Sequence, residues 1–230
     1  MIKKTAYIHL LNLLALLLLA ACTSCGGYGS SFIDIEENKV GQQKIEAEAY
    51  LFDVKIRRQG KPTSLRLDLY QTDSVIAMFG RAYFNKGAFR GKLTNDSLHI
   101  FFPASNEFLQ ESVDALFSSF NCQGILSGLP VFKYFSELPD STLSETGLEI
   151  RTLINENKKK SFEISATGCS WLMSLKYQKE DKGWRLNEFK FDDNESVRIK
   201  GSRRIYKSSA KIPSSRFELA IPSDSYRISI

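Results

Sequence analysis

From Ala47 to Phe102 the chain consists of successive short runs typical of β-strands, and this succession restricts its fold more than any other feature. Leu65-Arg-Leu-Asp-Leu69 is the clearest case, because its three leucines fall on one face of an extended strand and its polar residues on the other. Polar turn signals separate the successive runs, which are Ala47–Arg57, Leu65–Leu69, Val75–Phe84, Ala88–Leu93 and Leu98–Phe102. Short strands with polar turns and no helix between them predict an antiparallel meander and exclude a parallel doubly wound sheet.

The pattern changes after Ser105. Apolar residues recur at helical spacing between Asn106 and Phe120, which predicts an amphipathic helix capped by Ser105 or Asn106. The next segment, Gly124–Phe135, predicts a turn and a second helical piece. Strands resume in the runs Gly147–Asn155, Ser161–Ala166, Ser170–Gln178, Trp184–Phe191, Val197–Tyr206, Phe217–Ile221 and Tyr226–Ile230.

About ten antiparallel strands cannot stay flat, because strand twist accumulates until the sheet curls. We therefore expect a mainly β (α+β) domain over residues 44–230. Its core is predicted to be a strongly curved antiparallel sheet, or unclosed half-barrel, of about ten strands with helices covering its concave side. A two-sheet sandwich is the competing architecture.

The first residues have the pattern of a targeting segment. Lys3 and Lys4 precede the apolar run Leu10–Leu19, and the segment ends in Leu19-Ala-Ala-Cys22. This ending resembles the lipobox of bacterial lipoproteins, so residues 1–21 are predicted to be a cleaved signal peptide and Cys22 to be lipidated, with palmitate among its acyl chains. Two or more acyl chains anchor a protein stably to a bilayer. A secretory peptide that happens to precede a cysteine is the alternative.

Residues 22–43 are predicted to form the lipidated cysteine and a flexible tether, because glycine, serine and threonine dominate their first part. Thr23 stands where the enterobacterial sorting rule places aspartate in retained lipoproteins. By resemblance to that rule, we expect the protein to be lipid-anchored in the outer membrane and to face the periplasm.

The residue inventory argues against most enzyme classes. After removal of residues 1–21, His99 is the remaining histidine, and no Gly-x-Ser-x-Gly or phosphate-binding glycine motif is present. Asp192, Asp193 and Glu195 form an acidic group without a calcium-loop pattern. We expect a non-enzymatic protein with no metal and no cofactor. An enzyme of unfamiliar type, with polar side chains converging in a cleft, is the third class left open.

The charge of the chain gives no support for a nucleic-acid partner. The formal net charge is +5, and both signs are mixed along the sequence. Three basic clusters occur, at Arg57-Arg58, Lys158–Lys160 and Arg203-Arg204. They are interpreted as solvated strand ends, with anionic headgroups as the alternative partner.

Three cysteines remain when Cys22 is lipidated: Cys25, Cys122 and Cys169. In an oxidising compartment Cys122 and Cys169 are candidates for a disulfide that joins the middle segment to a later strand. The alternative is that they are separate, small buried side chains.

Residues 73–120 resemble a known family. Asp73-Ser-Val-Ile-Ala-Met-Phe79, Gly80-Arg-Ala-Tyr83, Gly91–Ile100 and the following predicted helix are similar to uncharacterised outer-membrane lipoproteins of Bacteroidota, a domain-of-unknown-function type. Those proteins resemble the LolA/LolB-like lipoprotein carriers in fold. The resemblance implies a curved sheet, helices over its mouth and an apolar cavity that accepts acyl chains.

A second resemblance concerns periplasmic O-glycosylation in Bacteroidota. Ser74, Ser97 and Ser141 each follow an aspartate and precede an apolar residue or threonine, the short pattern that Bacteroidota modify. Each tripeptide also reads as a turn before a strand.

The leading hypothesis is therefore a membrane-anchored lipoprotein that binds lipid, an acyl chain or a lipoprotein in an apolar cavity. The predicted lining consists of Leu65, Leu67, Leu69, Val75, Ala77, Phe79, Leu98, Ile100, Phe102, Leu116, Phe117 and Phe120. The same side chains could instead close-pack without a cavity. The alternative function is an outer-membrane assembly or interaction module that uses a sheet edge, or an aromatic surface around Trp171 and Trp184, to bind a protein or glycan.

Overall fold

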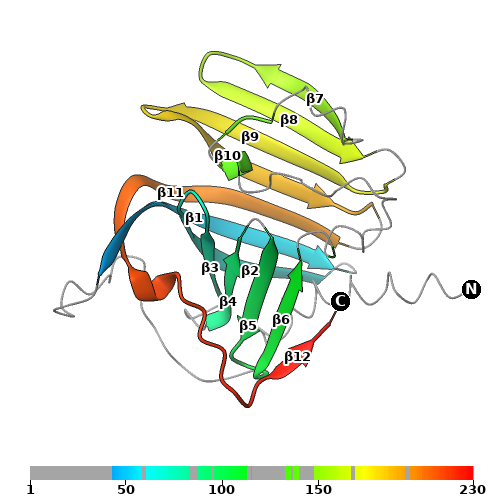
Figure 1. The fold of residues 1–230 in the computed structure, drawn as a ribbon. Helices are drawn as coiled ribbons and strands as arrows, with labels where there is room; N and C mark the ends of the chain where they lie inside the picture. Colours follow the sequence, from blue (N-terminus) through cyan, green and yellow to red (C-terminus); the bar gives the residue numbers. More distant parts are fainter. Residues whose placement is uncertain are drawn as a thin grey trace, which may run out of the picture.

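The computed structural model describes residues 43–58, 61–82, 87–94, 96–112, 115, 133–135, 137–139, 148–166, 169–194 and 197–229. Twelve strands form one open sheet in the order β12-β6-β5-β4-β3-β2-β1-β11-β10-β9-β8-β7 (Figure 1). All neighbouring strands are antiparallel except β12 and β6. The strands are β1 Lys44–Arg58, β2 Lys61–Gln71, β3 Ile76–Arg81, β4 Gly87–Leu93, β5 Ser97–Phe102, β6 Glu107–Ser112, β7 Leu148–Asn155, β8 Lys159–Ala166, β9 Leu172–Glu180, β10 Gly183–Asp192, β11 Val197–Pro213 and β12 Tyr226–Ile228.

The prediction of helices over the concave side is wrong. Apart from the helical Ala115, the described residues that lie outside the sheet and adopt regular structure form two short 3-10 turns, η3 Lys133–Phe135 and η5 Ser214–Arg216. The fold class is therefore nearly all β, and the sandwich alternative is also wrong, because the strands form a single sheet.

The predicted helix over residues 106–120 fails first at β6. Asn106 has a left-handed backbone (φ 55°) and closes the turn between β5 and β6, so the chain reverses where the helix was expected to begin. Leu109 then pairs with Ile100 across the hairpin and is buried with it. The long-range pairing outweighs the helical spacing of the apolar residues. Most of residues 113–132 lies outside the described part of the chain.

The sheet has one extensively apolar face, which we call the apolar face. Its largest cluster extends from β3 to β8 and includes the η3 turn. The buried strand residues of this cluster are Tyr50, Phe52, Val54, Ile56, Leu65, Leu69, Ile76, Phe162, Ile164, Leu175, Tyr177 and Leu186. A second cluster on the same face joins Ile100, Phe102 and Leu109.

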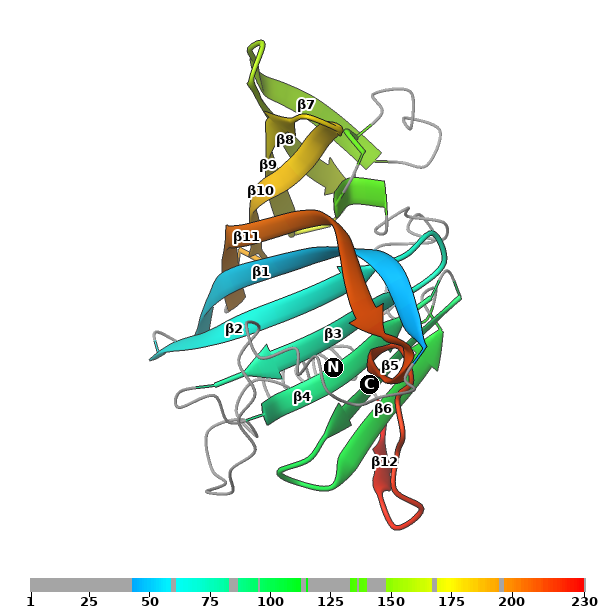
Figure 2. The ribbon, with the colours of Figure 1, turned by 90° about the vertical axis from the view of Figure 1, so that its left-hand side faces the viewer.

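The long central strands β1 and β11 bend as they cross the sheet (Figure 2). Their pairing contains two irregularities, between Ala47 and Ala49 and between Leu51 and Phe52, and such bulges increase local twist. The bent ends enclose a small core on the opposite face, in which Ala49, Ala77 and Phe217 are buried. The sheet is thus curved, and the curvature comes from the bending of its own strands.

After η5 the chain crosses to the far edge of the sheet and ends in β12 (Figures 1 and 2). The side chain of Asn106 fixes this segment: its amide donates to the carbonyl oxygen of Asp224 at 3.1 Å and its oxygen accepts from the Ser225 hydroxyl at 2.8 Å. The run Phe217–Ile221, which was predicted to be a strand, belongs to this non-strand connection.

Two glycines on the apolar face lie beneath aromatic rings. Gly201 of β11 is the cross-strand partner of Phe189, and Gly80 of β3 is the partner of Phe89. A β-carbon at either glycine would overlap the facing ring. Glycine in a strand interior often marks such a close approach.

Candidate functional site

The candidate site lies where β10 and β11 separate. Their backbone pairing covers only Glu188–Asp192 of β10 and Arg198–Ser202 of β11. Beyond it, β10 pairs with β9 alone and β11 continues along β1 (Figure 1). A bulge between Leu186 and Glu188 accompanies the separation. We call the diverging segments, Gly183–Leu186 and Arg203–Ser209, the fork.

Side chains replace backbone pairing in the fork. The Arg185 guanidinium donates to Glu48 Oε1 at 2.6 Å through Nη2 and to the Tyr206 hydroxyl at 2.7 Å through Nε. Tyr206 in turn donates to Glu48 Oε1 at 3.1 Å, and Tyr50 donates to Glu48 Oε2 at 2.6 Å. Three strands, β1, β10 and β11, are therefore joined through one carboxylate.

Burial and charge fix the protonation of this network. Burial, followed by the hydrogen bond to Glu48, raises the pKa of Tyr50 well above the ordinary value of a phenol. Burial also raises the pKa of Tyr206. Burial lowers the pKa of Arg185, because it disfavours the charged guanidinium. The hydrogen bond to Tyr206 and the negative charge of Glu48 outweigh this effect, so the pKa is raised overall. The phenols thus stay neutral donors, and the network is suited to holding a geometry rather than to exchanging protons.

Arg203 is the second guanidinium of the fork. Its Nη2 donates to Glu180 Oε1 at 2.5 Å, and its carbon Cζ lies 5.4 Å from the centre of the Tyr206 ring. The side chain is only 7% exposed, yet among the described residues Nη1 finds no hydrogen-bond acceptor. A buried guanidinium nitrogen without an acceptor is costly and favours an additional hydrogen-bonding partner.

The η3 turn adds a second such donor on the apolar face. The Tyr177 hydroxyl donates to the backbone oxygen of Tyr134 at 2.8 Å, and the Tyr50 hydroxyl lies 3.3 Å from the backbone oxygen of Phe135. The Tyr134 side chain is buried, but its own hydroxyl has no hydrogen-bond partner in the part of the chain that the structure describes. Within the described ranges, the apolar face therefore contains two buried donors, Arg203 Nη1 and the Tyr134 hydroxyl, that have no acceptor.

The predicted lining residues do not share one interior. Six of them lie on the apolar face, where Leu65 and Leu69 belong to the large cluster and Leu67 packs against it, while Ile100, Phe102 and Leu98 belong to the smaller one. Three others, Val75, Ala77 and Phe79, lie on the opposite face in the core enclosed by the bent strands. Leu116, Phe117 and Phe120 are outside the described residues.

The remaining predicted positions are placed as follows. Ser74 is exposed in a turn, and Ser97 bonds Thr94 in the turn before β5, at 3.0 Å between hydroxyl oxygens. Cys169 is disulfide-bonded. Cys22, Cys25, Cys122 and Ser141 lie outside the described residues, so the lipidation of Cys22 and the pairing of Cys122 with Cys169 stay predictions.

The tryptophans do not form an exposed aromatic surface. Trp171 is 6% exposed and stacks with Phe191, with ring centres 6.3 Å apart. Trp184 is half-buried beneath the Lys160 ammonium, 5.0 Å from the ring centre. These positions favour a core role over recognition of a glycan.

The acidic group at the β10–β11 turn is used structurally. Asp192 pairs with Arg198 at 2.8 Å, and buried Asp193 accepts from the backbone nitrogen of Val197 at 2.8 Å. In the described ranges no group of three or more histidine, cysteine or acidic side chains is placed to hold a metal ion.

The predicted candidates did not include the fork. Arg185 lies between Trp184 and Leu186, so a charged residue within an apolar strand was the one available signal. Its partner Glu48 is 137 positions away, and sequence pattern alone does not connect them. Arg203 was noted, but as part of a solvated pair with Arg204, whereas strand geometry buries Arg203 and exposes Arg204.

The fold and site thus define a nearly all-β protein built on one open sheet, with buried polar side chains on its apolar face. No protein-family model matches the chain, and no curated protein matches it in sequence. Helices long and apolar enough to cross a membrane are absent from the described residues.

Several solved structures are similar in shape. An uncharacterised conserved protein from Thermus thermophilus has 11% identity and a TM-score of 0.43, and the match covers 78% of this chain and 89% of that one. A DUF1329 family protein from Desulfovibrio piger has 10% identity and a TM-score of 0.44, with 94% and 96% covered. A domain from Vibrio parahaemolyticus, named for outer membrane lipoprotein sorting, has 9% identity and a TM-score of 0.35, with 70% and 84% covered. These similarities are too distant to assign a family, a ligand or a site.

Proposed function

We propose that the protein is a non-enzymatic, lipid-anchored envelope lipoprotein that holds the acyl chain of a lipid or lipoprotein against the apolar face. In this account the lipobox ending in Cys22 supplies the anchor. The outer membrane, facing the periplasm, is the proposed location.

One observation carries the proposal: the apolar face contains buried hydrogen-bond donors for which the described part of the chain supplies no acceptor. Arg203 Nη1 and the Tyr134 hydroxyl are both of this kind. A ligand for such a face needs an apolar body and an oxygen-rich end, because ligand sites are mostly apolar with a few polar groups that fix orientation. An acyl lipid has this chemistry.

Several partly buried side chains give an acyl chain room to make contact. Leu67, Met173, Phe191 and Ile199 pack against the large apolar cluster without being fully buried. These positions alternate with polar residues on the other face, so a chain lying along them would touch one side of the sheet only.

The test is native mass spectrometry, with lipid extraction, of the full chain purified from a Gram-negative envelope. We expect a co-purifying lipid in the wild type and its loss in Leu67→Glu, which places a charge on the apolar face. Phe79→Glu is the matched control, since Phe79 lies on the opposite face. It should retain the lipid.

A second test uses the variant Arg203→Met, which keeps the apolar surface but removes the guanidinium donor. Reduced lipid retention in a variant with unchanged circular dichroism would support the role of the unsatisfied guanidinium. A wild-type protein without lipid, which also takes none up from added vesicles, would refute the proposal.

A further inference from the structure

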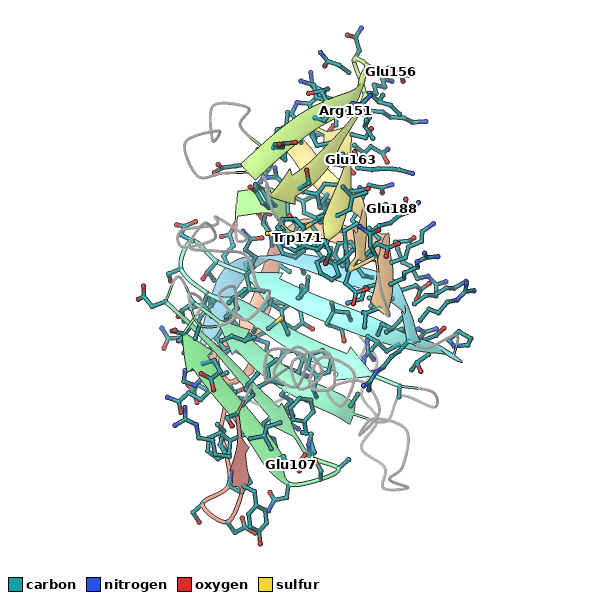
Figure 3. The ribbon with its side chains drawn as sticks, turned by 90° about the vertical axis from the view of Figure 1, so that its right-hand side faces the viewer. Glu107, Arg151, Glu156, Glu163, Trp171 and Glu188 are labelled. Carbon is teal, nitrogen blue, oxygen red and sulfur yellow. The ribbon has the colours of Figure 1, made fainter. Side chains whose placement is uncertain are left out.

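The face opposite the apolar face carries a strip of exposed cations on three adjacent strands. Lys55 and Arg57 lie on β1, Arg198 and Lys200 on β11, and Lys190 on β10. We call these five residues the basic strip. Figure 3 shows nitrogen-ended side chains projecting from the sheet on the side where Glu188 is labelled.

The cross-strand register brings like charges together. Lys55 is the direct partner of Lys200, and Lys200 is the direct partner of Lys190. Arg57 is likewise opposite Arg198. With strands about 4.8 Å apart, the three lysine backbones span only about 10 Å.

Such an arrangement works against the stability of the sheet, because like charges directly opposite each other repel. The neighbouring acids compensate for only part of the charge. Asp192 pairs with Arg198 at 2.8 Å. Glu188 pairs with Lys200 at 2.9 Å but is shared with Lys176 at 2.8 Å. Within the part of the chain that the structure describes, no ion pair joins Lys55, Arg57 or Lys190 to a carboxylate.

We propose that the basic strip docks the domain against the phosphate surface of an anionic bilayer. The cations are exposed side by side on an open sheet face, with no buried donor among them. This distribution fits a charged surface better than a single small anion, which is usually held by converging donors. Basic groups on one face are attracted to anionic leaflets within a Debye length.

The proposal goes beyond the acyl-binding function and uses the other side of the sheet. When the basic strip contacts the lipid headgroups, the apolar face points away from that membrane surface. Either proposal can fail while the other holds.

The experiment measures lysine accessibility in the full chain mixed with vesicles. A water-soluble amine-reactive reagent modifies exposed lysines, and mass spectrometry gives the rate at each site. Vesicles of phosphatidylcholine alone are compared with vesicles that also contain phosphatidylglycerol, so any binding through the acyl anchor is common to both. We expect Lys55, Lys190 and Lys200 to react about threefold more slowly with the anionic vesicles and to recover in about 0.5 M salt. The modification rates of Lys179 and Lys211, which are exposed but lie outside the basic strip, should be the same with both kinds of vesicle.

A pair of variants then tests the strip itself. In K55Q/K190Q the remaining Lys200 serves as the reporter, and its protection by anionic vesicles should disappear. The matched control K179Q/K211Q removes the same charge and should leave the protection of Lys200 intact. Equal reactivity with both kinds of vesicle, or protection that inorganic phosphate reproduces without vesicles, would overturn the proposal.

Discussion

Arg185 and Glu48 are 137 positions apart in the sequence and form an ion pair of 2.6 Å that ties β10 to β1. The pair lies where β10 and β11 cease to share backbone hydrogen bonds, and Tyr206 binds both partners. The polar network therefore connects β10 to β1 and β11 at the point where the backbone pairing between β10 and β11 ends.

Removal of one partner from this pair should be strongly destabilising. Arg185→Met leaves the carboxylate of Glu48 partly buried without its cation, and breaking such a pair costs about 3–5 kcal/mol. The free energy of unfolding from urea denaturation measures the loss. Asp53→Ala is the control, because its contacts with Arg66 at 4.0 Å and with Arg204 at 3.5 Å are both about half exposed, and exposed pairs contribute about 0–1 kcal/mol. Equal stability of Arg185→Met and the wild type would contradict this role.

Gly201→Ala tests the close approach of Phe189. The added β-carbon overlaps the ring, so the ring or the strand must shift, and overpacking of this kind costs about 1–3 kcal/mol. Thermal unfolding of Gly201→Ala and Gly87→Ala makes the comparison, since a β-carbon at Gly87 meets nothing within 4 Å. If both variants melt alike, the ring is not constrained by the glycine.

The Lys176–Glu188–Lys200 group gives the fold an acid-sensitive contribution. Burial raises the pKa of Glu188, but hydrogen bonds from Lys176 and Lys200 outweigh it, and the pKa falls below its usual 4.5. The folded state then binds fewer protons than the unfolded state, so this stabilisation is full above the usual pKa of glutamate and is lost as pH falls through the lowered value. Urea midpoints of the wild type and Glu188→Gln should differ at pH 7 and converge in acid. A difference that persists in acid would contradict the prediction.

The disulfide of Cys169 is predicted to join it to Cys122. Peptide mapping of the processed chain without reduction should yield a cross-linked peptide that contains both residues. A peptide that links Cys169 to Cys25 instead would refute the pairing.

Local sequence pattern was sufficient to predict most of the strands, but it did not predict which strands pair with each other. The alternation in Leu65–Leu69 correctly predicted β2, and its leucines lie on one face. The predicted helix at Asn106 failed because β6 takes its structure from pairing with β5, a tertiary effect. The clusters of basic residues in the sequence did not predict which cations lie together in the fold. Neighbours in a strand point to opposite faces, so Arg203 and Arg204 separate, whereas Lys55, Lys190 and Lys200 meet through register alone.

Ligand binding on the apolar face is tested most directly by photocrosslinking with a fatty acid that carries a diazirine in its tail. The labelled peptides of the full chain, mapped by mass spectrometry, should contain Met173, Phe191 or Ile199, which are partly buried against the large apolar cluster. Labelling should be saturable and competed by unmodified fatty acid. Labelling confined to the opposite core around Ala77 and Phe217, or no saturable labelling at all, would contradict the account.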